Sequence, residues 1–334
     1  MTVRFGVLGA GRIGQVHAGA IASVAGAELT AIADPIAAAA KSVSEKYGCD
    51  VRTIDEIAAS DDIDAVIICT PTDTHADLIE QFAKLGKAIF CEKPVDLSLE
   101  RVRKCLATVE AEDATLMVGF NRRFDPDFMA LKAAIDTGQI GDVEMLTITS
   151  RDPAAPPIEY ITRSGGIFRD MTIHDFDIAR WLLGEEVDSV MATASVLTDK
   201  AIGEAGDFDS ANVLLRTASG RQAVITNSRR AIYGYDQRIE VLGSEGLVAA
   251  KNRHESNIET ADSNGYNRPP LLNFFMTRYT EAYANEIKAF VAAVSDGGPT
   301  PTAGMDGLMA IALAEAAVLS VKEGRAVSLA EILN

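Results

Sequence analysis

Cysteine is scarce in this sequence, which holds four cysteines among 334 residues, at positions 49, 69, 91 and 105. Their wide separation excludes both a disulfide-stapled small domain and a C-x-x-C metal site. We expect buried, reduced thiols in a cytoplasmic protein. The chain passes from Met1 almost directly into an apolar run, Val3–Leu8, so we expect no signal peptide.

Basic residues and long apolar runs are also scarce. There are 31 Lys and Arg against 48 Asp and Glu, a formal net charge of −17. Such a surface repels a phosphate backbone, so we expect no nucleic-acid partner. The longest apolar run, Leu308–Val321, is too short to span a bilayer and contains Glu315, so we expect no membrane partner. The apolar content of 48% is sufficient for a full core and excludes a disordered chain.

The first 120 residues alternate short apolar runs with helix-like runs. The runs are continuously apolar, as in parallel strands that are covered on both faces. This alternation predicts a doubly wound parallel sheet, a Rossmann domain, over residues 1–121. The expected strands are Val3–Leu8, Glu28–Ala33, Val51–Ile54, Ala65–Cys69, Ala88–Cys91 and Thr115–Gly119. The expected helices include His75–Leu85, capped by Thr72 or Thr74 and ended by Gly86, and Leu99–Val109, capped by Ser98.

Residues 122–334 have a different pattern and predict an α+β domain with a large, mainly antiparallel open sheet. Apolar and polar residues alternate in its strands, which indicates one buried and one more polar face. Turns are expected at Ser219-Gly220 and at Gly243–Gly246. The expected strands are Val143–Thr149, Val187–Val196, Asn212–Arg216, Gln222–Asn227 and Gln237–Leu242, and the expected helices are Pro126–Ile135, Phe274–Val294 and Met305–Val321.

A glycine motif follows the first strand and opens the first helix. Gly9-Ala10-Gly11-Arg12-Ile13-Gly14 is a G-x-G-x-x-G sequence, and Asp34 ends the next strand twenty residues later. In this context the motif predicts a dinucleotide site, with the pyrophosphate at the helix N-terminus. The carboxylate of Asp34 can accept hydrogen bonds from the ribose hydroxyls and would repel a 2′-phosphate, so we expect NAD as the cofactor. A purely structural glycine turn is the alternative.

Two further clusters could carry the chemistry. Lys93, in Glu92-Lys93-Pro94, follows the fifth strand at the edge where open sheets bind ligands; the alternative is an ordinary surface lysine. Asp170 and His174 share one face if their segment is helical, and a neutral imidazole can accept an alcohol proton. The alternatives are a helix N-cap at Asp170 and a buried structural histidine. A metal site at His174, Asp175 and Asp177 is disfavoured, and we expect no metal.

Polar residues near the expected domain boundary are candidates for substrate contacts. Asn121 and Arg122 follow the sixth strand, at the mouth of an expected cleft between the two domains. Asp152 and Tyr235 are further candidates. Each of these residues, taken alone, has a structural role as its alternative.

The whole chain resembles the glucose–fructose oxidoreductase/inositol dehydrogenase/rhizopine-catabolism family. The resemblance rests on the glycine motif, on Cys69-Thr-Pro-Thr-Asp-Thr-His75, on Glu92-Lys93-Pro94, and on Gly165-Gly166 followed by Asp170-x3-His174-Asp175. Within the family, Phe120–Pro126, Ser150–Pro153 and Gly165–Phe176 are most similar to the inositol 2-dehydrogenases.

The resemblance implies an NAD-dependent polyol dehydrogenase with the catalytic set Lys93, Asp170 and His174. It also implies a peptide bond before Pro94 that is often cis, and a homotetramer built through the second domain's sheet. The expected reaction is myo-inositol to 2-keto-myo-inositol. Another inositol isomer, a pyranose such as glucose, or a non-catalytic NAD(H)-binding regulator is the alternative. The expected NAD contacts are Gly9, Gly11, Arg12, Ile13, Gly14, Asp34, Thr70, Pro71, Thr72, His75, Glu92 and Lys93; the expected substrate contacts are Lys93, Asn121, Arg122, Asp152, Asp170, His174 and Tyr235.

Overall fold

The computed structural model describes residues 2–334, which form two compact units. The first unit runs to Asp125 and includes Thr280–Ile311, and the second consists of Pro126–Tyr279 and Ala312–Asn334. A segment from the C-terminal part of the chain therefore belongs with the N-terminal unit. The sequence analysis expected a single division near residue 121 and did not predict that a later segment packs with the first unit. Local sequence patterns carry no information about which distant segments pack together.

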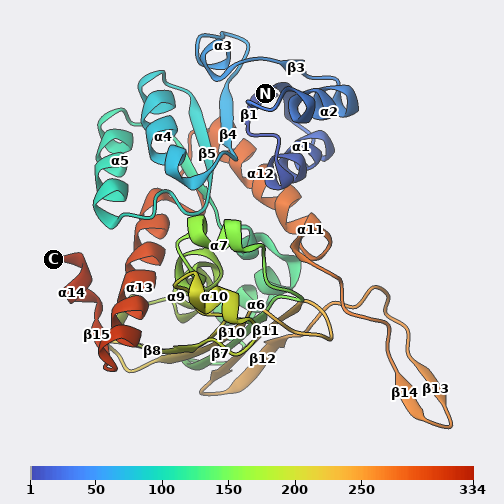
Figure 1. The fold of residues 1–334 in the computed structure, drawn as a ribbon, viewed down its shortest axis with the longest axis vertical. Helices are drawn as coiled ribbons and strands as arrows, with labels where there is room; N and C mark the ends of the chain where they lie inside the picture. Colours follow the sequence, from blue (N-terminus) through green and yellow to red (C-terminus); the bar gives the residue numbers. More distant parts are fainter. Residues whose placement is uncertain (1) are drawn as a thin grey trace. The chain divides into compact units, whose positions relative to one another are not determined.

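The first unit is built on a six-stranded parallel sheet, as expected (Figure 1). The strand order is β3-β2-β1-β4-β5-β6, so the connections reverse direction between β1 and β4. Ligands of open sheets bind at such a reversal, beyond the carboxyl ends of the strands. The strands are β1 (Val3–Leu8), β2 (Ala27–Ala33), β3 (Asp50–Val51), β4 (Ala65–Ile68), β5 (Ala88–Glu92) and β6 (Leu116–Gly119).

Helices pack on the sheet of the first unit. α1 packs against α12, a helix from the C-terminal part of the chain, and α4 packs against α5. Side chains of β5 alternate between the faces, so Phe90 packs on His17 of α1 and Phe290 of α12. The helices are α1 (Arg12–Ser23), α2 (Ala37–Tyr47), α3 (Ile54–Ala58), α4 (His75–Lys84), α5 (Leu99–Ala111) and α12 (Thr280–Asp296), with 3-10 turns η1 (Thr72–Thr74) and η2 (Asn121–Phe124).

Two local expectations in this unit are wrong. The strand expected to reach Ile54 ends at Val51, because Thr53 and Glu56 form a capping box that starts α3. No side chain caps α4, because the Thr74 hydroxyl is hydrogen-bonded to Thr70 and to the Pro71 carbonyl instead. The cap expected at Ser98 is confirmed by its bond from the Arg101 amide.

The second unit has a seven-stranded sheet in the order β12-β11-β7-β10-β9-β8-β15. It is mainly antiparallel as expected, except that β7 and β10 are parallel. Both expected turns are confirmed, between β9 and β10 and between β11 and β12. The strands are β7 (Val143–Arg151), β8 (Val187–Ser195), β9 (Ser210–Thr217), β10 (Gln222–Ser228), β11 (Asp236–Gly243), β12 (Gly246–Ala250) and β15 (Val327–Ser328).

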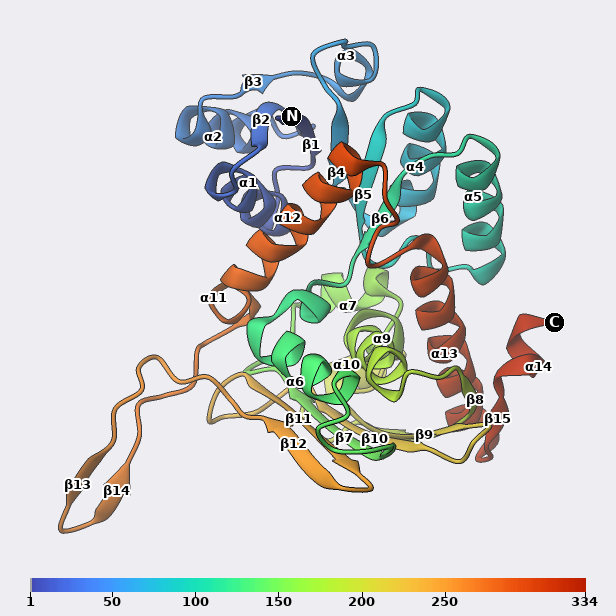
Figure 2. The ribbon, with the colours of Figure 1, turned by 180° about the vertical axis from the view of Figure 1, so that it is seen from behind.

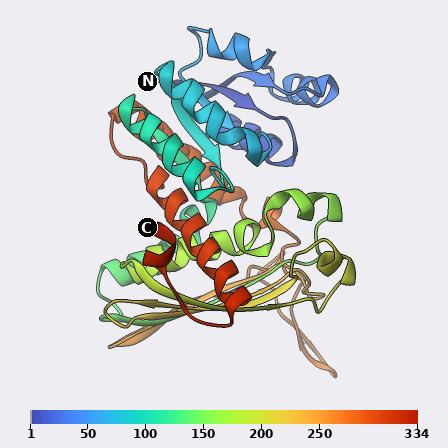
Figure 3. The same cartoon turned by 60° about the vertical axis from the view of Figure 1, so that its left-hand side comes forward.

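Helices cover one face of this second sheet and leave the other open (Figures 2 and 3). α6 packs on β12, and α9 packs on β7 and β10. A separate hairpin, β13 (Thr260–Asp262) with β14 (Gly265–Asn267), extends away from the sheet. The helices of this unit are α6 (Pro126–Asp136), α7 (Ile158–Ser164), α8 (Ile167–Asp170), α9 (Thr172–Leu183), α10 (Lys200–Glu204), α11 (Phe275–Arg278) and α14 (Leu329–Leu333).

The apolar run expected at Leu308–Val321 lies in a longer helix, α13 (Gly304–Glu323). Among the described residues this is the one helix long and apolar enough to cross a membrane, and 67% of its apolar window is buried within the protein. Such burial is typical of the core helix of a folded protein, which satisfies the same length and composition criteria.

Candidate functional site

The glycine loop has the geometry that a bound pyrophosphate requires. Gly9 has φ +102°, and a Cβ there would lie 2.6 Å from the carbonyl oxygen of Cys69. A Cβ on Gly14 would overlap the Gly9 carbonyl oxygen, so this glycine lets the helix pack against the loop. A Cβ on Gly11 would meet nothing within 4 Å. Because Gly11, the N-cap of α1, has no side chain to cap the helix, the N-terminus of α1 is available to an anion.

The carboxylate of Asp34 is fixed beside this loop. It accepts hydrogen bonds from the amides of Ala10, at 2.6 Å, and Ile36, at 2.7 Å. Each carboxylate oxygen has a second lone pair, so both can still accept a ribose hydroxyl. The residues present therefore fit NAD: an uncapped helix start for the pyrophosphate and a rigidly held acceptor for the ribose.

The segment after β4 is tied to the segment after β5 by His75. One ring nitrogen of this buried histidine lies 2.8 Å from the carbonyl oxygen of Thr70, and the other lies 2.8 Å from that of Pro94. The side chain of His75 thus positions the loop that holds Thr70, Pro71 and Thr72. Its contact with NAD, expected from the sequence, stays a prediction.

Lys93 directly follows β5 and is half-buried. The peptide bond between Lys93 and Pro94 is cis, as the resemblance implies. The carboxylate of the preceding Glu92 is directed into the helix layer, where it is hydrogen-bonded to His17. Lys93 therefore follows the carboxyl edge of the sheet to which the glycine loop and Asp34 also belong, and the expected contact of Glu92 with NAD stays a prediction.

The sequence analysis placed Asp170 and His174 on one helix face if their segment is helical. The structure instead divides this segment into two helices. α8 ends at Asp170 and α9 begins at Thr172, with Met171 between them as the N-cap. The N-cap role considered for Asp170 is therefore wrong. Its carboxylate accepts a 2.8 Å hydrogen bond from the hydroxyl of Tyr160 and forms a 3.3 Å ion pair with Arg229.

Arg229 is a functional candidate whose pairing with Asp170 the sequence analysis did not predict. Its side chain is 1% exposed and pairs with both Asp170 and Asp207. Asp207 in turn accepts the Ile167 amide at the start of α8. A guanidinium that is buried without a partner strongly destabilises a protein, which favours keeping both ion pairs of Arg229. These ion pairs hold Asp170 in place. No local motif contains Arg229, which is distant in sequence from Asp170.

His174 lies in the first turn of α9 and is half-buried. The next residue, Asp175, is fully buried and accepts a 2.8 Å hydrogen bond from Asn227 on β10. Asp175 therefore lies in the interior of the second unit, and its hydrogen bond with Asn227 joins α9, the helix that contains His174, to β10.

The remaining substrate candidates differ in their surroundings. Asn121 and Arg122 are buried in η2, which packs on α12 within the first unit. Asp152 is half-buried, and its amide is bonded to the Ser228 carbonyl. Tyr235 is 6% exposed, and its ring packs on Phe274 and Tyr279. All four roles stay predictions.

Comparison with known families agrees with both units. A model of the GFO/IDH/MocA C-terminal domain matches residues 128–249, and one described as "Oxidoreductase family, NAD-binding Rossmann fold" matches residues 3–120. The chain belongs to the Gfo/Idh/MocA oxidoreductase family. It is an enzyme of that family with an NAD-binding Rossmann domain, which confirms the expected fold, cofactor and reaction class.

Relatives match along the whole chain. The inositol 2-dehydrogenase of Rhizobium meliloti is 68% identical, covering 99% of this chain and 100% of that protein. The myo-inositol 2-dehydrogenase of Thermotoga maritima is 46% identical with the same coverage. A solved structure of scyllo-inositol dehydrogenase from Lactobacillus casei, with NAD(H) and scyllo-inositol, is 28% identical with a TM-score of 0.92, covering 99% of this chain and 100% of that one.

Proposed function

We propose that this member of the family oxidises myo-inositol to 2-keto-myo-inositol with NAD. The observation that carries the proposal is the 68% identity with an inositol 2-dehydrogenase over essentially the full length of both chains. The geometry of the glycine loop and of Asp34 fits NAD and supports NAD as the cofactor of this reaction.

Three side chains have roles in this proposal. Bound NAD supplies the acceptor for the hydride that leaves C2 of the polyol. His174 accepts the proton of the C2 hydroxyl as a general base. The ammonium of Lys93 donates a hydrogen bond to the same oxygen and stabilises its developing negative charge. Asp170, held by Tyr160 and Arg229, orients a neighbouring hydroxyl and favours the imidazolium form of His174.

A substrate panel tests the proposal. We would follow NAD reduction at mildly alkaline pH with myo-inositol, scyllo-inositol, chiro-inositol and glucose, and repeat each assay with NADP. We expect the highest kcat/KM with myo-inositol and NAD. Higher kcat/KM with scyllo-inositol, the ligand of the Lactobacillus casei structure, would replace the substrate but retain the mechanism. NAD binding without turnover of any polyol would favour the regulator alternative.

Cofactor selection provides a prediction at Asp34. The variant Asp34→Ala should lower kcat/KM with NAD by about tenfold to a hundredfold, because the ribose loses a charged acceptor. It should also reduce the ratio of kcat/KM with NAD to kcat/KM with NADP, because the carboxylate that repels a 2′-phosphate is removed. Asp34→Asn is the matched variant, since it also removes the charge but its amide oxygen can still accept the Ala10 amide. It therefore separates the loss of charge from the loss of the hydrogen bond to the loop. Unchanged cofactor preference in both variants would contradict the role of Asp34.

We further propose a homotetramer that covers the open face of the second sheet. The strand register places two rows of apolar side chains on this face: Leu247, Leu242 and Met145 in one, Val224, Leu214 and Met191 in the other. Met145 and Leu247 are 50% and 52% exposed in a single chain. A second copy of the same face is the partner that matches such a surface without requiring charged groups.

A pair of charges in these rows should disrupt the assembly. Because Val224 and Leu214 lie opposite each other on β10 and β9, Val224→Glu with Leu214→Glu places like charges at the centre of the face. Sedimentation velocity should show a tetramer for the natural chain and a smaller species for the variant. A natural chain that sediments as a monomer at micromolar concentration would contradict the proposal.

A cytoplasmic location is part of the same proposal. All four cysteines are buried and none forms a disulfide. Burial raises the pKa of the Cys69 and Cys91 thiols well above the ordinary value, which keeps them unreactive. A reducing compartment suits such a chain.

A further inference from the structure

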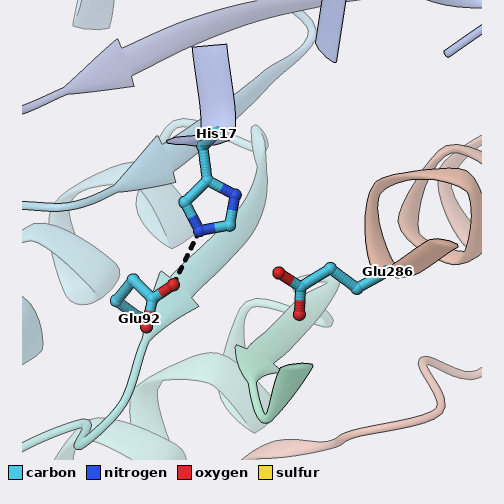
Figure 4. A group of neighbouring side chains, drawn as sticks. All are labelled: His17, Glu92 and Glu286. Carbon is cyan, nitrogen blue, oxygen red and sulfur yellow. Dashed lines mark hydrogen bonds and ion pairs between the residues drawn. The ribbon is translucent and has the colours of Figure 1, made fainter. Parts of the chain in front are cut away.

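A buried cluster of three ionisable side chains lies beside the strand end that precedes Lys93. His17 comes from α1, Glu92 from β5 and Glu286 from α12, so the three come from distant parts of the first unit (Figure 4). One nitrogen or oxygen atom of each lies within 4.8 Å of those of the others. His17 Nε2 is 2.6 Å from Glu92 Oε1. Figure 4 shows the Glu286 carboxyl group directed at this pair.

The cluster is shielded from water. His17 and Glu286 are 0% exposed and Glu92 is 8% exposed. The His17 ring packs in T-shaped contacts with the rings of Phe90 and Tyr283. A Cβ on Gly119 would lie 3.2 Å from the Glu92 carboxyl atoms, so the neighbouring strand leaves just enough room for this side chain.

The three groups differ in their hydrogen bonds. The short bond between His17 Nε2 and Glu92 Oε1 is satisfied when the imidazole N–H donates to the carboxylate, which can only accept. Neither oxygen of Glu286 has a hydrogen-bond partner. An ionised Glu286 would be a buried charge with no counter-ion, close to a second carboxylate, and both features strongly disfavour ionisation.

A divalent cation is the other species that could relieve this repulsion. Two ligand atoms of one ion, each about 2.1 Å from the metal, are separated by about 3 Å or more. The 2.6 Å separation of His17 Nε2 and Glu92 Oε1 is shorter than this and matches a charge-assisted hydrogen bond. The geometry therefore favours a proton over a metal ion.

We propose that Glu286 is a neutral carboxylic acid whose packing against the His17–Glu92 pair fixes the strand end that precedes Lys93 against the glycine-loop helix. His17 follows Gly14 by one turn of α1, and Glu92 is bonded to Lys93 in the chain. The cluster thus connects the pyrophosphate loop to the lysine. His17, Glu92 and Glu286 are positioning residues, and their effect on turnover rests on the role proposed for Lys93.

The surroundings favour the same protonation state. Burial and the nearby Glu92 charge raise the pKa of Glu286 well above its ordinary value. Titratable groups that face the cluster include Tyr283 of α12, whose ring packs on His17, and the thiols of Cys69 on the β4 side and Cys91 on β5. The pKa values of both thiols are raised first by burial and then by Glu92. Arg123, on η2 against α12, forms an ion pair with Asp306.

Infrared spectroscopy of the full chain detects the proton directly. We expect the carbonyl stretch of a protonated carboxylic acid at neutral pH, and its loss in Glu286→Gln. The matched control is Glu281→Gln, an exposed glutamate on the same helix, which should retain the band. The absence of the band from the natural chain would overturn the proposal. So would an equimolar metal ion, measured by elemental analysis after dialysis, that is lost in Glu286→Gln.

Thermal unfolding supplies a second measure of the proton. Since the folded state holds a proton that the unfolded chain releases, the natural chain should lose stability as the pH rises above the ordinary glutamate range. Glu286→Gln cannot ionise, so its Tm relative to the natural chain should rise with pH. A relative Tm that stays constant or falls from pH 5 to pH 9 would contradict a neutral Glu286.

Kinetics test the positioning role. Glu92→Gln keeps the shape but removes the charge that holds His17, so we expect kcat to fall about tenfold while the Kd of NAD changes little. A weaker Kd with unchanged kcat would show that cofactor binding is the main role of Glu92 and would overturn the positioning role. If the natural chain oxidises no polyol, the proposed function fails, whereas the infrared and unfolding results still decide the state of Glu286.

Discussion

Replacing Lys93 by methionine should lower kcat for myo-inositol oxidation by about a hundredfold to a thousandfold, the usual effect of removing one donor to a developing oxyanion. Methionine retains most of the lysine's apolar length but donates no hydrogen bond. The Kd of NAD should stay within about threefold, because the glycine loop and Asp34 remain intact. Titration of NAD by protein fluorescence, together with steady-state kinetics, separates the two effects.

Lys87→Met is the matched control for this variant. Lys87 lies just before β5, at the opposite end of the strand, where its ammonium donates to the Ser60 and Ile63 carbonyls. Its replacement should reduce stability and leave kcat within a few-fold. A Lys93→Met enzyme with near-natural kcat would remove Lys93 from the chemistry, and a large rise in its NAD Kd at near-natural kcat would leave cofactor binding as its main role.

Replacing His174 by glutamine should lower kcat by about 10²-fold to 10⁴-fold, the usual contribution of a general base. The base must be neutral to accept a proton, so natural activity should fall as the pH is lowered through the range in which histidines titrate. The variant should lose this fall in activity at low pH, the acid limb of the profile, as well as most of its rate. The measurement is the pH profile of kcat/KM for myo-inositol in both proteins.

His254→Gln controls for a general effect of losing a histidine. Its Nδ1 lies 2.6 Å from the Pro269 carbonyl oxygen, in the segment that leads to and from the β13–β14 hairpin. This variant should retain the acid limb. If the His174→Gln profile keeps the natural shape at reduced height, another group is the base and His174 only supports the site.

The N-terminal fold was predictable because its information is local. A strand, a G-x-G-x-x-G turn, a helix and an acid at the next strand end occur in one short stretch, and each glycine has a steric reason that the structure confirms at Gly9 and Gly14. The capping box at Thr53 was missed because a short capped helix and a strand end are similar in such a brief polar segment.

The environment of the candidate site was less predictable, because it depends on distant pairs. Arg229, just after β10, binds Asp170 at the end of α8, and Glu286 joins Glu92 from a helix near the opposite end of the chain. No periodicity relates such residues. The break at Met171 was also hidden, since the residues from Ile167 to Leu183 have helical character on both sides of it.

Hydride transfer from C2 of the polyol to NAD is the central claim, and deuterium tests it most directly. myo-Inositol deuterated at C2 would be oxidised, and both products would be examined by mass spectrometry. We predict singly deuterated NADH, an undeuterated 2-keto product and a rate no higher than that of the unlabelled substrate. Unlabelled NADH, or a ketone that retains the deuterium, would contradict oxidation at C2 by this chain.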